Sequence, residues 1–263
     1  MRLQTEWGVR IMNISWNADA YKQNFAFVHQ YGVSVTELID FQKAMTAIDL
    51  GCGNGVLTAA MKEKGLDVTG LDASPEQLEI ARKNYPDIPF VLADATNFTV
   101  KEPVDVVFSN AVFHWIDRER QKDMLACVAG VLRPGGQFVF EMGGHGCVAK
   151  IHSALKDAFA VFGYAYELPN YFPGIGEYAP MVEQAGFEVR TALLFDRFTE
   201  LKGADGMRDW INMFVHRPFE MVKGDAVKEK IIQQAVDALR PSLFIEGKWF
   251  ADYVRLRMKA IKI

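Results

Sequence analysis

The sequence predicts an α/β fold built on a doubly wound, mostly parallel sheet. Between residues 44 and 142, short apolar runs alternate with segments whose apolar residues recur at helical spacing. Such alternation is typical of parallel strands connected by helices that cover both faces of the sheet. The final residues instead alternate between apolar and basic side chains, which indicates a half-solvated strand. We therefore expect an antiparallel C-terminal edge strand beside the parallel core.

Five strands and three helices make up the predicted core. The strands are predicted from short apolar runs at residues 46–50, 67–71, 89–92, 104–109 and 137–142. The helices are predicted from helical spacing at residues 56–65, 76–85 and 118–132. Ser74 is a natural N-cap for the second helix, and Gln77 completes a capping box. The third helix is expected to end at Arg133-Pro134-Gly135-Gly136, which is a strong stop signal.

The remaining segments are predicted to cap this sheet within one domain, because the chain of 263 residues shows no internal repeat and no linker. The N-terminal segment 1–43 is expected to form a helical cap. Two insertions, at 143–180 and 203–250, are rich in aromatic residues and are expected to form helical lids. Segments 187–198 and 252–263 are predicted as the C-terminal edge strands.

The composition is that of an ordinary globular protein and excludes several classes. Half of the residues are hydrophobic and 24% are charged, which rules out a disordered or fibrous chain. The net charge of −4 provides no basic field, so no nucleic-acid partner is expected. No uncharged apolar run approaches the ~18 residues of a membrane span, so membrane insertion is not expected. The three cysteines form no C-x-x-C pair, which favours a reducing, cytoplasmic compartment.

Function is indicated by the segment Asp49-Leu50-Gly51-Cys52-Gly53-Asn54-Gly55, which lies between the first strand and the first helix. Glycines in such a turn let backbone amides approach a ligand closely, and Asp72, at the tip of the next strand, can accept both hydroxyls of a ribose. These residues predict an adenosine-containing cofactor. NAD and FAD are disfavoured because Val56 stands where a dinucleotide fingerprint has its third glycine. A phosphate loop is excluded because no G-K-[ST] follows the glycines.

The order of these motifs resembles the class I S-adenosylmethionine-dependent methyltransferases, whose fold is a Rossmann-like sheet. The resemblance covers residues 44–142 and rests on Asp49 to Gly55, Leu71-Asp72, Ala93-Asp94-Ala95, Ser109-Asn110-Ala111 and Leu132 to Gly136. The segment Asn110-Ala111-Val112-Phe113-His114-Trp115 is most similar to the trans-aconitate methyltransferase-like small-molecule branch. The resemblance implies S-adenosylmethionine as cofactor, S-adenosylhomocysteine as product and a small-molecule acceptor.

The resemblance also implies which residues bind the cofactor. They are Asp49, Gly51, Gly53, Asn54, Gly55, Asp72, Ala73, Gln77, Asp94, Ala95, Asn110 and Ala111. Asp49 would lie beneath the amino-acid part of the cofactor, Asp72 would hold the ribose, and Asp94 would meet the adenine amino group. The other residues would shape the turn, border the adenine or lie near the sulfonium.

A catalytic base is the next question, and His114 is the candidate. Methyl transfer is an in-line displacement at carbon, so catalysis can rest on proximity, alignment and desolvation of the nucleophile. A base is needed only when the acceptor must lose a proton. His114 follows the fourth strand at the cofactor edge and titrates near neutrality. The alternative is that His114 packs and hydrogen-bonds to shape the pocket.

Aromatic residues outside the core are candidates for the acceptor site or its lid. The candidates are Trp16, Tyr21, Tyr31, Trp115, His145, Tyr171 and Phe172. Ligands of such sheets bind at the carboxyl ends of the strands, where the N-terminal segment and the insertion after the fifth strand would converge. Aromatic faces could cover a sulfonium there by cation–π attraction, but core packing explains the same residues equally well.

Other functions stay open from the sequence. A cofactor-binding sensor or partner subunit without turnover would keep the same cofactor residues. A cyclopropane synthase-like lipid enzyme and an NAD-dependent oxidoreductase have less support. No metal is expected, because His145, Cys147 and His152 lack a further ligand at a recognised spacing. No motif indicates the acceptor atom or the oligomeric state.

Overall fold

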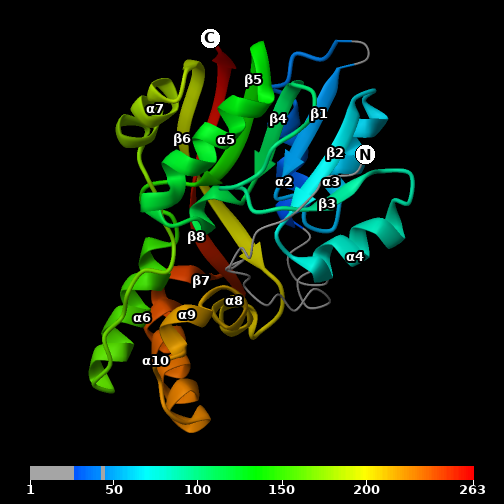
Figure 1. The fold of residues 1–263 in the computed structure, drawn as a ribbon. Helices are drawn as coiled ribbons and strands as arrows, with labels where there is room; N and C mark the ends of the chain where they lie inside the picture. Colours follow the sequence, from blue (N-terminus) through cyan, green and yellow to red (C-terminus); the bar gives the residue numbers. More distant parts are fainter. Residues whose placement is uncertain (1–26, 43–44) are drawn as a thin grey trace.

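The computed structural model describes residues 27–42 and 45–263. Trp16 and Tyr21 lie outside these residues, and only the backbone of Tyr31 is described, so the predicted roles of their side chains stay predictions. Figure 1 shows a twisted sheet with helices on both faces and a further group of helices beyond one end of the sheet. The predicted α/β class is confirmed.

The sheet has a parallel part and an antiparallel part. The parallel strands are β1 (Thr46–Leu50), β2 (Asp67–Asp72), β3 (Phe90–Leu92), β4 (Val104–Asn110) and β5 (Leu132–Gly143). The antiparallel strands are β6 (Phe187–Leu201), β7 (Phe244–Ile245) and β8 (Lys248–Lys262). The order is β3-β2-β1-β4-β5-β8-β6, with β7 paired to β8. Strand order reverses between β1 and β4, and ligands of such sheets bind at the carboxyl ends beside this reversal.

Helices cover both faces because alternate residues of the central strands point in opposite directions. The covering helices are α2 (Phe27–Thr36), α3 (Val56–Glu63), α4 (Pro75–Asn84), α5 (Gln121–Val131) and α7 (Ile175–Gln184). The 3-10 turns η1 (Phe113–Trp115) and η2 (Arg118–Arg120) precede α5. Val106 and Phe108 of β4 pack in one apolar cluster with residues of α2 and α3, whereas Val107 packs in another with residues of α5 and α7. This is the double winding that the sequence predicts.

The other helices form a layer with its own apolar core, which we call the helical layer. It consists of α6 (Ala149–Val161), α8 (Gly206–Phe214), α9 (His216–Phe219) and α10 (Asp225–Leu243). Phe159, Trp210 and Ile231 are buried together at its centre. Figure 1 shows these helices side by side, away from the parallel strands. The two insertions therefore pack mainly on each other and on the lower parts of β6 and β8.

The position of the last strand differs from the prediction. The antiparallel end of the sheet is confirmed, but β8 lies between β5 and β6, so residues 252–263 are not an edge strand. The basic residues that indicated a solvated face are largely buried, since Arg255 and Arg257 lie beside the buried Glu141 of β5. Glu141 bonds directly to Arg257 and lies 3.9 Å from Arg255. The local sequence pattern does not reveal this buried carboxylate.

Candidate functional site

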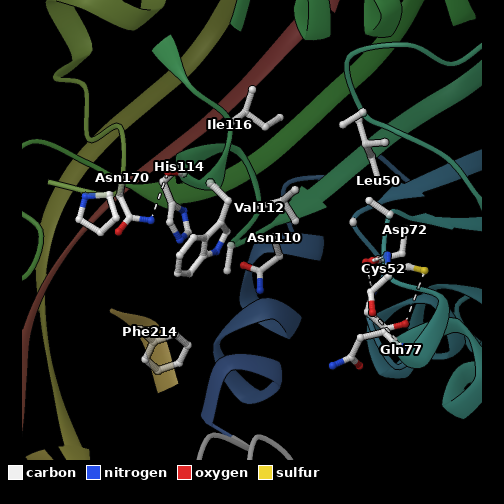
Figure 2. Close-up of a pocket in the computed structure, with 18 of the residues that line it drawn as sticks. Leu50, Cys52, Asp72, Gln77, Asn110, Val112, His114, Ile116, Asn170 and Phe214 are labelled. Atoms are coloured by element: carbon white, nitrogen blue, oxygen red, sulfur yellow. Dashed lines mark hydrogen bonds between the residues drawn. The ribbon is translucent and has the colours of Figure 1, made fainter. Parts of the chain in front are cut away.

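A cavity of about 790 Å³ lies between the strand ends and the helical layer (Figure 2). Its strand-end wall includes Asp49, Gly53, Asp72, Ala73, Gln77, Asp94, Ala95, Asn110 and Ala111. Its opposite wall, which we call the aromatic wall, includes Trp115, Phe172, Trp210 and Phe214. The volume falls within the ~300–1,000 Å³ of small-molecule sites. Residues from distant parts of the chain therefore share one cavity, which lies at the predicted edge of the sheet.

The glycine turn after β1 follows a left-handed backbone path. Gly51, Gly53 and Gly55 have φ angles of 77°, 53° and 83°. A Cβ atom on Gly51 would lie 2.2 Å from Val112 Cγ2, and one on Gly55 would overlap an aromatic ring. A Cβ atom on Gly53 would meet only Gln77 Oε1, at 3.9 Å. Gly51 and Gly55 thus pack the turn against its neighbours, whereas Gly53 presents its backbone to the cavity.

Asp72 ends β2 and holds the turn and the next helix in place. Its Oδ2 accepts a hydrogen bond from the Gly53 amide at 2.8 Å, and its Oδ1 accepts one from the Ser74 amide at 2.8 Å. Ser74 is the predicted N-cap, since its hydroxyl accepts from the Gln77 amide at 3.2 Å. The reciprocal half of the predicted capping box is supplied by Asp72 instead of the Gln77 side chain. Burial raises the pKa of Asp72.

Asp49 lies beneath the glycine turn, enclosed by the core. Thr58, in the first turn of α3, donates a 2.6 Å hydrogen bond to Asp49 Oδ2. Burial raises the pKa of Asp49 to about 7, and the negative charge of Asp72 adds to this rise. A buried carboxylate is costly unless it is paired, so the two acids make this end of the cavity favourable for a cation.

The loop after β3 contributes a third acid. Asp94 Oδ1 accepts hydrogen bonds from the amide and the hydroxyl of Thr96, at 2.8 and 2.7 Å. Its Oδ2 lies 3.5 Å from Arg120 on η2. The carboxylate is thus held by its own turn, and Ala95 lines the cavity beside it. An acceptor of hydrogen bonds at this place is compatible with the predicted contact to an adenine amino group.

Backbone geometry is unusual where β4 ends at the cavity. Ala111 has a φ of 61°, a left-handed conformation that non-glycine residues rarely adopt. Its amide donates a 2.7 Å hydrogen bond to the Glu141 carbonyl of the adjacent strand, which holds the chain in this path. Strained backbone of this kind clusters at functional sites. Asn110 and Ala111 both line the cavity, and their contact with the cofactor stays a prediction.

The surroundings of His114 favour a positioning role over that of a base. Its Nδ1 accepts a hydrogen bond from the Gly143 amide at 3.2 Å, so the neutral ring carries its hydrogen on Nε2. Burial, together with the charge of Arg255, lowers the pKa of His114 to about 3. The backbone carbonyl of His114 accepts from the Tyr171 amide and from Asn170 Nδ2 (Figure 2). His114 can therefore donate to a ligand, whereas accepting a proton there is unfavourable.

His114→Gln is accordingly expected to keep a chemical step within about tenfold of the wild-type rate, since a general base typically contributes ~10²–10⁴-fold. At saturating substrates, kcat should show no inflection from His114 in the range where an ordinary histidine titrates. Single-turnover rates across pH measure both quantities. A hundredfold loss in the variant, with a wild-type inflection near neutrality that the variant lacks, would establish His114 as the base.

The aromatic wall contains some of the predicted lid residues and lacks others. Trp115 and Phe172 line the cavity and flank His114, with ring centroids 5.3 and 5.8 Å from its ring. Tyr171 points elsewhere, because its hydroxyl donates to Glu177 on α7. His145 also lies outside the described lining of the cavity. The predicted acceptor-site roles of Tyr171 and His145 therefore have no support from the geometry.

Several lining residues have no counterpart in the sequence prediction. They include Asn170, Trp210, Phe214, Tyr253 and Arg255. Trp210 Nε1 donates a 2.6 Å hydrogen bond to the Tyr253 hydroxyl, which ties α8 to β8. Arg255 appeared in the sequence only as part of an alternating basic pattern. The missing signal was the burial of Arg255 at the cavity, which no local pattern supplies.

The described residues contain neither a group of side chains suited to a metal ion nor a helix suited to a membrane. Within residues 27–42 and 45–263, no three His, Cys, Asp or Glu side chains are grouped to hold a metal ion. Over the same ranges, no helix has the length and apolar character required to cross a membrane. The side chains that line the cavity include acids, arginines, histidines and aromatic rings.

Comparisons with known proteins bear on this site. Residues 47–136 match the family described as methyltransferase domain. The chain is 33% identical over 261 residues to an uncharacterized methyltransferase of Schizosaccharomyces pombe, covering 94% of this chain and 98% of that one. It is 24% identical over 209 residues to a trans-aconitate 2-methyltransferase of Shigella dysenteriae, covering 78% and 80%. A solved Haemonchus contortus phosphoethanolamine N-methyltransferase, in complex with S-adenosylhomocysteine, has a similar fold, with a TM-score of 0.56 at 16% identity over 93% of this chain and 56% of that one.

Proposed function

The chain belongs to the class I S-adenosylmethionine-dependent methyltransferases, and we propose that it transfers the methyl group to a small-molecule acceptor. The observation that carries the proposal is the single cavity that joins the strand-end wall to the aromatic wall. In this arrangement the strand ends hold the cofactor and the aromatic wall holds the acceptor. The two ligands then meet near His114 and Asn110.

The residues of the strand-end wall fit S-adenosylmethionine. Gly53 has no Cβ where the chain must approach the ligand, and a Cβ there would meet only Gln77 Oε1, at 3.9 Å. The oxygens of Asp72 each accept one backbone hydrogen bond and keep a second lone pair for a ribose hydroxyl. Asp49 offers a buried carboxylate for the ammonium group. These are the groups that we assign to cofactor binding.

The protein's part in the reaction is to align the reactants and to exclude water. When bound, the cofactor supplies an electrophilic methyl group on a positively charged sulfur. Transfer of that methyl group to the acceptor, with cleavage of its bond to sulfur, would leave S-adenosylhomocysteine as the product. Rings such as Trp115 and Phe172 remove water from the nucleophile, which supports in-line displacement without a protein base.

Asp72→Ala tests the cofactor site. Loss of two charge-assisted hydrogen bonds to the ribose, each ~1.5–3 kcal/mol before water compensates, is expected to weaken S-adenosylhomocysteine binding at least tenfold. Asp67→Ala, at the exposed start of the same strand, is the matched control and should bind as wild type. Calorimetry measures both affinities. Equal affinity in Asp72→Ala and Asp67→Ala would contradict the assignment.

Turnover needs a separate experiment, because a sensor or partner subunit would bind the same cofactor. The wild-type protein is incubated with methyl-labelled S-adenosylmethionine and a deproteinised extract of small molecules. Labelled product that Asp72→Ala forms more slowly would support the proposed enzyme. Tight binding of S-adenosylhomocysteine with no transfer to any molecule of the extract would instead favour the non-catalytic alternative.

A further inference from the structure

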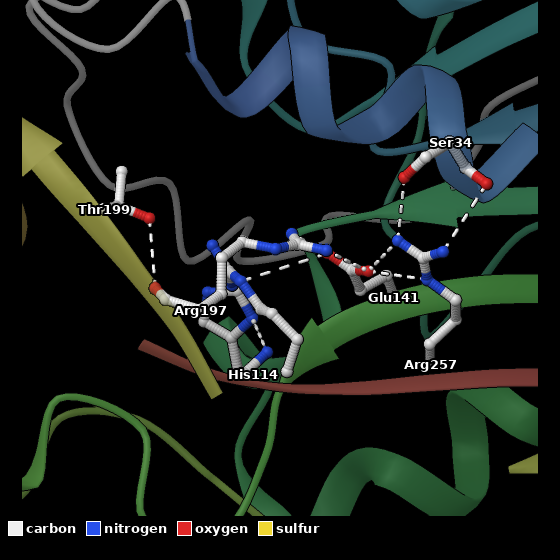
Figure 3. A network of polar contacts seen from close by, with 8 residues as sticks. Ser34, His114, Glu141, Arg197, Thr199 and Arg257 are labelled. Carbon is white, nitrogen blue, oxygen red and sulfur yellow. Dashed lines mark hydrogen bonds and ion pairs between the residues drawn. The ribbon is translucent and has the colours of Figure 1, made fainter. Parts of the chain in front are cut away.

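Three arginines surround one buried glutamate at the antiparallel end of the sheet. Glu141 of β5 is 2% exposed and lies beside Arg197 of β6 and Arg255 and Arg257 of β8. Figure 3 shows the network that they form with Ser34 of α2. We call the three arginines, Arg197, Arg255 and Arg257, the arginine cluster. One buried and two half-buried cations against one buried anion leave an excess of positive charge in the cluster.

Two of the three arginines together bind both oxygens of the Glu141 carboxylate. Arg197 binds both carboxylate oxygens through Nη1 and Nη2. Arg257 Nε donates to Glu141 Oε2 at 2.8 Å, and its Nη2 donates to the Ser34 hydroxyl at 2.9 Å. A carboxylate held by two guanidinium groups in this way has no need of a third. The pairing of the Glu141 carboxylate therefore does not require Arg255.

Arg255 is the unsatisfied member of the cluster. Its side chain is 7% exposed, and its Nε is a buried donor without a hydrogen-bond partner in the described part of the chain. The nearest Glu141 oxygen is 3.9 Å from Nε, beyond hydrogen-bonding distance. The guanidinium lies over the Tyr253 ring, 4.5 Å from its centroid, and Trp210 fixes that ring through the tyrosine hydroxyl. The guanidinium group is thus held in one place, with its Nε donor unused within the described part of the chain.

Arg255 also lines the cavity. The other arginines of the cavity lining are Arg120 and Arg217, and each has an acidic partner, Asp94 and Asp117 respectively. Among the arginines of the described lining, Arg255 therefore lacks an acidic partner within hydrogen-bonding distance, and it lies next to His114, whose Nε2 hydrogen is a second donor. A buried guanidinium is costly without an anion, and its planar pair of N–H groups matches the two oxygens of a carboxylate.

We propose that Arg255 binds a carboxylate of the acceptor, which makes the substrate an organic acid. The inference rests on the proposed function, because it assumes that the aromatic wall holds the acceptor. Arg255 is thereby a specificity-determining residue, and the unpaired charge is kept for the ligand. In the protein without substrate, Arg255 should then contribute nothing to the stability of the fold, in contrast to Arg197.

The first test compares the stability of two variants without any substrate. Arg255→Met removes the excess charge and leaves Glu141 bonded to both Arg197 and Arg257. The melting temperature of this variant should therefore equal or exceed that of wild type. Arg197→Met removes a bonded partner of Glu141 and should melt lower. A loss in Arg255→Met as large as that in Arg197→Met would make Arg255 structural and overturn the proposal.

The second test identifies the acceptor class. A deproteinised small-molecule extract is separated on an anion exchanger, treated with phosphatase, and offered to the protein with methyl-labelled S-adenosylmethionine. We expect label in the retained acidic fraction, at least tenfold less with Arg255→Met, and wild-type activity with Arg190→Met, which changes an exposed arginine of β6. S-adenosylhomocysteine affinity should be the same in all three proteins.

The outcomes separate the two proposals. Label in the unretained fraction, unchanged transfer by Arg255→Met, or loss of the acceptor after phosphatase treatment would overturn a carboxylate at Arg255 while leaving the methyltransferase intact. Failure of wild-type protein to bind S-adenosylhomocysteine, or binding with no transfer in any fraction, would instead overturn the proposed function. Partial recovery by Arg255→Lys, which restores the charge without the planar donor pair, would support recognition of the carboxylate's geometry.

Discussion

Gly51→Ala is expected to destabilise the protein by about 2–5 kcal/mol, because a left-handed residue costs ~1–2 kcal/mol and an overpacked one ~1–3 kcal/mol. The added Cβ would lie 2.2 Å from Val112 Cγ2. Gly53→Ala shares the positive φ, but its Cβ would meet only a side-chain oxygen at 3.9 Å. The Gly53→Ala variant should therefore lose only the conformational part of the free energy of unfolding, ~1–2 kcal/mol. Urea unfolding of both variants measures the difference.

Val112 provides a control for the steric part of this effect. Truncation to alanine removes the two methyl groups nearest to the added Cβ, so Gly51→Ala with Val112→Ala should be more stable than the sum of the single changes predicts. Gly53→Ala with Val112→Ala should be additive. Similar losses of stability for Gly51→Ala and Gly53→Ala, without coupling to Val112, would show that backbone conformation alone requires the glycines.

The parallel core could be predicted from sequence because its signals are local. The strand at 46–50 agrees with β1, and the helix at 76–85 agrees within a residue with α4, since the apolar period and the Ser74 cap lie within the segments themselves. The interior place of β8 has no local signal, because the strands that flank it and the Glu141 that binds Arg257 are distant in the chain, Glu141 by more than a hundred residues. An alternating basic strand has the same pattern whether water or a buried carboxylate faces it.

The candidate site likewise has one wall that the sequence predicts and one that it does not. The strand-end wall follows from one segment and one fold rule, because parallel strands bring Asp49, Asp72 and Asp94 to a common edge. The opposite wall contains Trp210 and Arg255, which the helical insertions and the reversed strand bring to the cavity. Each is unremarkable in its own segment, so their contribution becomes visible only when tertiary packing shows what is buried and what lacks a partner.

S-adenosylhomocysteine affinity is expected to fall about hundredfold between pH 8 and pH 5 if the ammonium group of the cofactor pairs with Asp49. The pKa of Asp49 in the free protein is about 7, because burial raises it and Asp72 adds to the rise. A bound ammonium favours the ionised carboxylate and lowers this pKa, so a proton and the ligand compete. Binding near pH 7 should release about half a proton, which calorimetry in buffers of different ionisation enthalpy measures.

Asp49→Asn separates this effect from other titrations. The amide oxygen can still accept the Thr58 hydrogen bond, but the charge and the titration are gone. The variant should bind with a nearly flat pH dependence, weaker than wild type at pH 8 and about equal to it at pH 5. Residual dependence in Asp49→Asn would report Asp72, whose pKa burial also raises. Equal slopes in wild type and Asp49→Asn would remove Asp49 from contact with the ammonium group and leave it a structural acid that holds α3 to the turn.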